Sequence, residues 1–300
     1  MEHVLYFVIS RISWNEWRRD PVSRLTVRRL TPRMELRKCV KDIWVFESAG
    51  GLSEEELQVV VPNGSAKLML YYKGDFTGLV CQRAYKLPEH KLFILGVSDC
   101  AAVAEFDRDK PFGCICFELH PAGAYRLLAV SHHELRNNLV PFEEIDGGPV
   151  YRMFEERIVL ASDPAQKAIL LQDYLIRLLS LTEPDAKFEY SIHAIRNSRG
   201  LLPIADLSQD LGVSDRWLRA KYAERLGLSP KTFASIVRFQ HCFQALMRDK
   251  RGFMENRQFQ DYYYDQAHFI KEFKRFIGHS PARYSSLQNE VGEIIYTDNP

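Results

Sequence analysis

Residues 262–276 read YYYDQAHFIKEFKRF, and this stretch decides how the C-terminal part of the chain folds. Phe269, Phe273 and Phe276 recur at i, i+4 and i+7, which is the spacing of one apolar face on an amphipathic helix. Asp265 stands where an N-cap residue accepts a bond from a free backbone N–H, and a glycine just beyond the stretch supplies a stop. The pattern therefore predicts a helix that packs its phenylalanines on a neighbour and leaves a polar, basic strip outside.

The residues before this stretch also have helical patterns. Four helices are predicted, over residues 190–198, 203–212, 214–227 and 229–249. A weaker helical segment over 253–262 leads into the helix that carries the three phenylalanines. The second and third helices are joined by the tight turn LGVS, which is the arrangement of a helix-turn-helix. The helix from Pro230 to Arg248 would span about 28 Å, close to the roughly 34 Å of one turn of duplex DNA.

The charge of the chain is unevenly distributed. Residues 196–284 hold 16 Lys and Arg against 9 Asp and Glu, although the whole chain carries a net charge of only +1. The rest of the chain is therefore acidic, at about −6. Such a balance indicates that only the C-terminal part meets a polyanion such as nucleic acid. Chance asymmetry among surface residues is the alternative explanation.

A helix reads the major groove when one flank is anchored on its own domain and the other presents side chains that reach base edges. Between 215 and 225, Leu218 and Tyr222 form the anchoring side and Ser214 the cap. The candidate DNA contacts of both predicted units are Arg216, Arg219, Lys221, Gln266, Ala267, His268, Ile270 and Lys271. A single chain with two such helices on one rod would read a long, asymmetric site in double-stranded DNA.

The sequences ADLSQDLGVSDRWLRAKYAERLGLSPKTF (205–233) and YYDQAHFIKEFKRFIGHSPARY (263–284) carry a family resemblance. The segment from about 192 to 284 resembles the DNA-binding domain of the AraC/XylS family of bacterial transcription regulators. By position, the resemblance implies base contacts from Arg216, Arg219, Gln266, Ala267, Ile270 and Lys271. Ile270 would meet a thymine methyl group.

Three residues depart from the family pattern. Ala220 stands where the family usually has an arginine, and Gln258 and Tyr262 replace a small alanine and a turn glycine. A tyrosine in a left-handed turn would cost roughly 1–2 kcal/mol, so a different local backbone with a repacked tyrosine turn is expected. These departures motivate an alternative: a degenerate member of the family that acts as a protein-binding adaptor with weak or no DNA affinity.

Upstream, residues 55–120 contain short β-branched and aromatic runs divided by turn signals. The runs are LQVVVP, KLMLYY, GLVC, KLFILG and GCICFEL. They predict a small antiparallel β-sandwich or barrel. Helical patterns flank it at 32–40, 121–130 and 151–180, the last broken near Asp163-Pro164. The predicted fold class is thus an α+β N-terminal domain followed by an all-α C-terminal domain with two helix-turn-helix units.

The chain is divided on this basis into four parts. Residues 1–180 are an effector-sensing or dimerisation domain, and 181–190 are a linker. Residues 191–286 are the DNA-binding domain, and 287–300 are a tail. Residues 30–180 resemble the N-terminal domain that often precedes this DNA-binding module. A small-molecule effector, contact with RNA polymerase and a homodimer are further expected partners.

The N-terminal domain offers weak candidates for an effector site. They are Tyr71, Phe93, Phe117 and His120, although alternation along strands favours core positions for them. A metal enzyme needs three converging ligands, and this region offers only His90 and His120, far apart in sequence. No phosphate-binding loop, nucleophile elbow or paired carboxylates point to an enzyme. We therefore expect neither catalysis nor a metal or other cofactor.

The six cysteines form no C-x-x-C pair, which favours buried thiols in a reducing cytoplasm over a disulfide framework. The apolar run near the start is too short for a membrane span. The sequence therefore predicts a cytoplasmic, sequence-specific DNA-binding transcription regulator that its N-terminal domain modulates.

Overall fold

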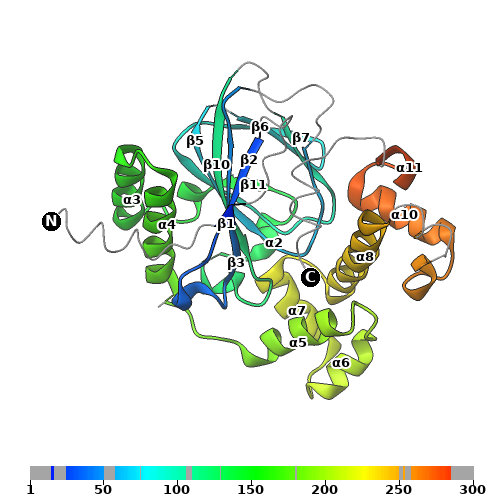
Figure 1. Ribbon diagram of the computed structural model, residues 1–300. Helices are drawn as coiled ribbons and strands as arrows, with labels where there is room; N and C mark the ends of the chain where they lie inside the picture. Colours follow the sequence, from blue (N-terminus) through cyan, green and yellow to red (C-terminus); the bar gives the residue numbers. More distant parts are fainter. Residues whose placement is uncertain are drawn as a thin grey trace.

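The computed structural model describes residues 15–16, 25–50, 58–74, 76–105, 110–128, 130–179, 181–249, 253 and 258–284. The described chain up to the end of α4 (Pro164–Leu179) forms two antiparallel β-sheets with accompanying helices. The described chain after α4 is helical (Figure 1). The predicted fold class, an α+β part followed by an all-α part, is therefore confirmed.

The larger sheet has seven strands. In spatial order they are β1 (Asn15–Glu16), β2 (Leu25–Leu30), β3 (Val40–Ser48), β10 (Phe112–Leu119), β5 (Lys67–Lys73), β8 (Lys91–Leu95) and β11 (Leu139–Pro141). The central strand β10 pairs antiparallel with both β3 and β5. All of its residues are buried, which explains why its sequence FGCICFEL shows so little polar alternation.

The smaller sheet has four strands. In spatial order they are β4 (Gln58–Val60), β9 (Ala102–Glu105), β6 (Phe76–Val80) and β7 (Arg83–Leu87). A two-residue turn joins β6 and β7, and its residues Cys81 and Gln82 have φ of 47° and 68°, as tight hairpins require. The rings of Tyr71 in β5 and Phe76 in β6 lie 4.7 Å apart, so the two sheets share one core.

Two of the predicted helical segments are wrong. Residues 32–40 contain only the 3-10 helix η1 (Met34–Leu36) before β3 begins, and the described residues of 121–130, which leave out 129, contain only the 3-10 helix η2 (Ala124–Arg126). Pairing with β2 and β10 draws Val40 and the following residues into the sheet, so tertiary contacts override the local helical pattern.

The predicted break near Asp163-Pro164 is confirmed, since it separates α3 (Pro149–Leu160) from α4. The two sheets and the helices that accompany them, up to the end of α4, are called the β-domain below. Within it, α3 and α4 pack together through a cluster of aromatic rings. Tyr174 of α4 stacks at 4.9 Å on Phe154 of α3 and lies 5.9 Å from Phe142 in η3 (Phe142–Glu144).

The helical part has seven described elements. They are α5 (Ala186–Asn197), α6 (Ile204–Asp210), α7 (Asp215–Leu226), α8 (Pro230–Arg248), η4 (Gln258–Asp261), α10 (Gln266–Ile277) and α11 (Pro281–Tyr284). The bounds of α8 match the prediction, and α5 begins within the segment predicted as a linker. Of the weaker segment over 253–262, residues 254–257 lie outside the described residues, as does the tail from 287.

The expectation of six free thiols is wrong. Cys81 and Cys100 form a disulfide, whereas the other four cysteines are free and buried. The two partners follow β6 and precede β9, strands that pair through Val80 and Ala102. Sheet pairing therefore brings together two cysteines whose spacing in the sequence matches no motif.

Candidate nucleic-acid interface

Helix α7 is anchored along one side. Leu218 and Tyr222 are buried, and the hydroxyl of Ser191 in α5 donates a hydrogen bond of 3.1 Å to the hydroxyl of Tyr222. Ser214 caps the helix, because its hydroxyl accepts the backbone N–H of Trp217 at 3.1 Å. The predicted anchor and cap of this helix are confirmed.

The opposite side of α7 faces solvent. Arg216 and Arg219 are exposed, and neither guanidinium has an ion-pair or hydrogen-bond partner within the described ranges. Lys221 is half-buried and pairs with Glu224 at 3.1 Å. The two arginines are thus free to contact an external ligand, whereas the lysine already has an intrahelical partner of modest strength.

The turn between α6 and α7 is held at its two ends. The hydroxyl of Ser208 donates to the carboxylate of Asp215 at 2.6 Å, which joins one helix to the start of the next. Gly212 lies in the left-handed region with φ of 60°, where glycine carries no steric cost. Leu207 is buried beneath the turn, so the predicted helix-turn-helix geometry is present in this unit.

Helix α10 is capped at its start and buried along one side, as α7 is. The carboxylate of Asp265 accepts the backbone N–H of His268 at 2.7 Å, and Gly278 ends the helix with φ of 85°, so both predicted ends are confirmed. The three phenylalanines on its apolar face are fully buried. On the opposite side Gln266, Ala267, His268 and Lys271 are exposed, and Ile270 is half-buried.

Helix α8 supports both of these helices. Near its start Phe233 lies 6.1 Å from the ring of Tyr222 in α7. Further along, Phe239 lies 4.8 Å from Phe276 in α10. The guanidinium of Arg238 adds an ion pair of 3.2 Å with Glu272, so α10 is held by apolar and charged contacts together.

The tyrosine turn before α10 differs from a glycine turn. Tyr262 does not have a positive φ, so the strain expected of a left-handed tyrosine is absent. Its ring stacks parallel to His241, whereas Tyr263 is buried and Tyr264 is 92% exposed. Tyr262 and Tyr263 are therefore packed against the domain, whereas Tyr264 faces solvent. Ala220 is exposed on α7, and the side chain of Gln258 lies outside the described residues.

The four candidate effector residues line neither the hollow between α3 and α4 nor the one beside Lys67. Tyr71, Phe93 and Phe117 are buried in the core, and the rings of Tyr71 and Phe93 meet at 6.3 Å. His120 lies at the end of β10, where burial, followed by the charges of Arg196 and Lys41, lowers its pKa to about 4. A hollow of about 270 Å³ lies elsewhere, between α3 and α4.

A buried polar cluster also lies in the β-domain. The amide of Asn63 donates to Glu118 at 2.7 Å, and the ammonium of Lys67 donates to the Asn63 side-chain oxygen at 3.3 Å. Burial raises the pKa of Glu118, but the charges of Lys41 and Lys67 outweigh it and the pKa is lowered. The hollow beside Lys67 has a volume of only about 10 Å³, enough for one water molecule. In this conformation the cluster has no room for an effector.

The helical part packs directly on the β-domain. The Gln240 amide of α8 donates to the carbonyl of Pro62 at 2.5 Å. Gly227 at the end of α7 approaches α2 (His132–Leu135) so closely that an added Cβ would lie 2.3 Å from the carbonyl oxygen of His132. These contacts involve the ends of α7 and the side of α8, and they leave Arg216 and Arg219 exposed.

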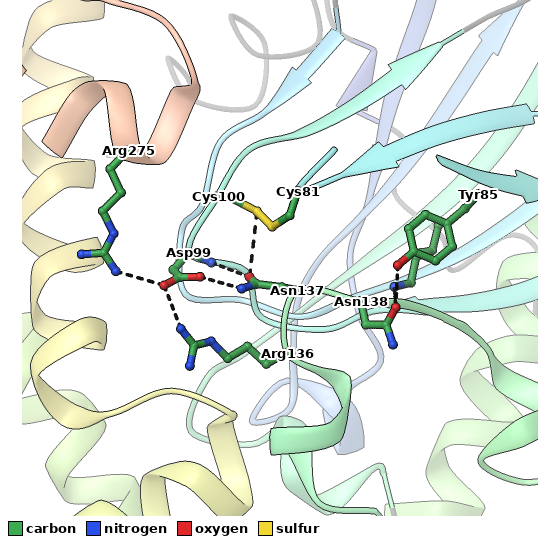
Figure 2. The surroundings of a disulfide bond; sticks show 9 residues. Cys81, Tyr85, Asp99, Cys100, Arg136, Asn137, Asn138 and Arg275 are labelled. Carbon is green, nitrogen blue, oxygen red and sulfur yellow. Dashed lines mark hydrogen bonds and ion pairs between the residues drawn. A yellow bond between two sulfur atoms is a disulfide. The ribbon is translucent and has the colours of Figure 1, made fainter. Parts of the chain in front are cut away.

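Sequence patterns did not identify two functional candidates near this interface, Arg275 and Asp99. Arg275 of α10 pairs at 3.0 Å with Asp99, which belongs to the loop between β8 and β9 (Figure 2). Arg275 lies on the polar strip that the phenylalanine spacing predicted, so its position on the exposed side could have been found. Asp99 could not, because no local pattern identifies an acid whose partner lies 176 residues away.

Two parts of the chain match known protein families. Residues 207–286 match the family model described as "Helix-turn-helix domain", and residues 28–141 match "Domain of unknown function (DUF6597)". No curated protein matches the chain. The first match covers α7, α8 and α10, and all eight candidate DNA contacts lie on α7 and α10.

Solved structures of low sequence identity also resemble the chain. A structure of ToxT from Vibrio cholerae is 11% identical, covers 82% of this chain and 98% of its own, and has a TM-score of 0.46. ToxT from Vibrio cholerae with a bound unsaturated fatty acid is 14% identical, covers 81% and 93%, and has a TM-score of 0.45. A cupin domain of a transcriptional regulator from Enterobacter cloacae is 16% identical, covers 33% and 99%, and has a TM-score of 0.28.

Among the residues that the structure describes, no helix has the length and apolar content needed to cross a bilayer. In the same ranges, no three His, Cys, Asp or Glu side chains gather in a way that could hold a metal ion.

Proposed function

We propose that the chain is a transcription regulator of the AraC/XylS type that reads two successive major-groove segments, on the premise that residues 207–286 match a helix-turn-helix domain. The observation that carries the proposal is that α7 and α10, each capped and each exposing cationic or amide side chains, pack on the same helix α8. Because α8 would span about 28 Å, it can separate two helices by about one duplex turn.

The chemistry of the exposed side chains supports this role. A guanidinium binds guanine through two parallel hydrogen bonds, and an amide binds adenine in the same way. Arg216 and Arg219 are assigned to the first groove segment, and Gln266 and Lys271 to the second. Ile270 supplies the apolar contact for a thymine methyl, and His268, at the first turn of α10, is placed near a phosphate.

We assign the N-terminal domain to the control of this binding. Its support is the direct packing of α7 and α8 on the β-domain, which allows a change in one domain to alter the position of the other. An effector would need a pocket that the buried Tyr71, Phe93 and Phe117 leave closed in this conformation. A homodimer is the second role proposed for this domain, because Met153 and Leu160 of α3 are exposed apolar residues.

The test is selection of duplexes from a random-sequence pool by the full chain, followed by affinity measurements over a range of salt concentrations. Specific binding predicts an enriched motif in two parts about one helical turn apart. The slope of log K against log salt should be about −0.9 for each phosphate contact. Arg219→Ala should lower the affinity, whereas Arg152→Ala, an exposed arginine in α3, should leave it unchanged.

An adaptor that binds only proteins is the competing function, motivated by Ala220 and the altered turn at Tyr262. It predicts that no motif is enriched and that the full chain shows no salt-dependent binding to duplex DNA. That result would reject the proposed function.

A further inference from the structure

The loop between β8 and β9 brings an acidic residue onto helix α10. Figure 2 shows the carboxylate of Asp99 between two guanidiniums, Arg136 from the β-domain at 2.9 Å and Arg275 from α10 at 3.0 Å. Arg275 joins α10 to the β-domain by this ion pair. The contact therefore links the second helix-turn-helix unit to the N-terminal domain through one carboxylate.

Arg275 occupies the face of α10 that is assigned to DNA. It follows Lys271 by four residues, and residues with this spacing lie about 40° apart around a helix and one turn along it. The Asp99 carboxylate bound to Arg275 therefore places a negative charge one helical turn from Lys271, on the face assigned to DNA. The same guanidinium can donate to a DNA phosphate instead, so Asp99 and a phosphate compete for it.

Asp99 is held in position from its own domain. The side-chain amide of Asn137 donates to the Asp99 carboxylate at 2.7 Å, and its oxygen accepts the Asp99 backbone N–H at 3.0 Å. Burial would raise the pKa of Asp99, but the Asn137 hydrogen bond and the charges of Arg136 and Arg275 outweigh it and the pKa is lowered. The direction of the Asp99 carboxylate is therefore set by Asn137 and Arg136 from its own domain, independently of Arg275.

The disulfide is covalently next to this anion. Cys100 follows Asp99 directly and is bonded to Cys81 at the tip of the β6–β7 hairpin, with 5.8 Å between the Cα atoms. The sulfur of Cys100 also lies 4.0 Å from the Asn137 side-chain oxygen that binds Asp99. The bond thus ties the Asp99 loop to the smaller sheet at the residue that follows the carboxylate.

The two disulfide-bonded cysteines are also more accessible to solvent than the four free cysteines. Cys81 and Cys100 are half-buried, whereas Cys39, Cys114, Cys116 and Cys242 are buried. A disulfide in a compartment that keeps thiols reduced is typically transient and redox-sensing. A half-buried disulfide at a domain contact suits that use better than a bond inside the core.

We infer that the Cys81–Cys100 disulfide is a redox-controlled latch that holds Asp99 on Arg275 and so withholds the second recognition helix from DNA. A dithiol reductant opens it by thiol–disulfide exchange. The dithiol supplies two electrons and two protons, the Sγ–Sγ bond breaks to give two thiols, and the dithiol is oxidised to its own disulfide through a mixed disulfide. The Asp99 loop then loses its tether, and holding the carboxylate in place for Arg275 costs more conformational entropy.

The first arm of the test measures the latch without DNA. Amide hydrogen exchange of residues 266–277 is followed in the full chain, oxidised with glutathione disulfide or reduced with dithiothreitol. We expect exchange to be about twofold to fivefold faster after reduction, the range of a partly exposed ion pair. Asp99→Asn, which keeps the size of the side chain, should show the faster rate in both states.

The second arm rests on the proposed function and measures affinity for a duplex enriched by the reduced full chain. Reduction should raise affinity about twofold to fivefold, and Asp99→Asn and the Cys81→Ser/Cys100→Ser double variant should be high in both states. Asp99→Asn is preferred to a change at Arg275, since the latter also removes a DNA contact. Lys274→Gln, a neighbouring exposed cation on α10, is the matched control and should keep the redox response.

Peptide mapping without reductant should first find the Cys81 and Cys100 peptides joined, and their absence would overturn the inference. Equal exchange and equal affinity in the oxidised and reduced wild-type chain would also overturn it, even if Asp99→Asn alters both. If no duplex is enriched, the proposed function fails, and the exchange arm alone decides whether the latch exists.

Discussion

Replacing Phe273 by alanine tests whether the apolar face of α10 fixes the second recognition helix. The ring of Phe273 is fully buried, and its centroid lies 5.7 to 6.1 Å from four other aromatic rings. Those rings belong to α8, α10 and α11, so three elements meet on this one side chain. Its removal leaves a cavity at the joint between them.

The expected cost follows from burial and from the surrounding rings. Phe→Ala substitutions in cores cost about 3–5 kcal/mol, and the cost is larger where neighbours cannot collapse into the cavity. Rings attached to three packed elements cannot move far, and each lost edge-to-face contact adds roughly 0.5–1.5 kcal/mol. We therefore expect a loss of about 4 kcal/mol in the free energy that holds α10 in place.

The assay is urea unfolding of the full chain combined with amide hydrogen exchange of residues 266–277. Phe273→Leu keeps most of the volume and should cost at most about 1.5 kcal/mol. Lys274→Ala, on the solvent side of the same turn, should stay within about 0.5 kcal/mol. If Phe273→Ala changed neither the unfolding midpoint nor the exchange rate of α10, the phenylalanine face would not be what positions this helix.

Four further outcomes are expected. Arg219→Ala should weaken binding to the selected duplex by roughly 1–3 kcal/mol in titrations, and an unchanged curve would remove this residue from base reading. Gly227→Ala should lower the melting temperature of the full chain much more than Gly212→Ala, because both glycines have positive φ but only an added Cβ at 227 meets a backbone oxygen at 2.3 Å. Burial lowers the pKa of His132 to about 4, so between its ordinary value and 4 the unfolded chain binds a proton that the folded chain does not. His132 should therefore contribute about 1–2 kcal/mol to the loss of stability from pH 7 to pH 5, so the loss should be smaller by that amount in His132→Leu; equal losses in both proteins in urea titrations would contradict this assignment. A fragment of residues 185–300 should retain specific binding, which mobility-shift titration against the same duplex would check, and its failure would show that DNA reading needs the β-domain.

Much of the helical part could be predicted because its signals are local. Asp265 and Ser214 cap helices through hydrogen bonds to backbone groups three residues away, and the Phe269–Phe273–Phe276 spacing defines one face of one helix. The exposed positions of Arg219 and Lys271 follow from the same periodicity. Such contacts form within a few residues, so the order of amino acids is enough to reveal them.

Only the tertiary structure decided the contacts between distant segments. Residues 32–40 have a helical pattern, yet pairing with β2 and β10 places Val40 in a strand. The Cys81–Cys100 bond arises because β6 and β9 lie side by side, and Asp99 meets Arg275 because the helical part packs on the β-domain. Each of these contacts depends on how sheets and domains pack around a shared core, a collective property that no short window of sequence contains.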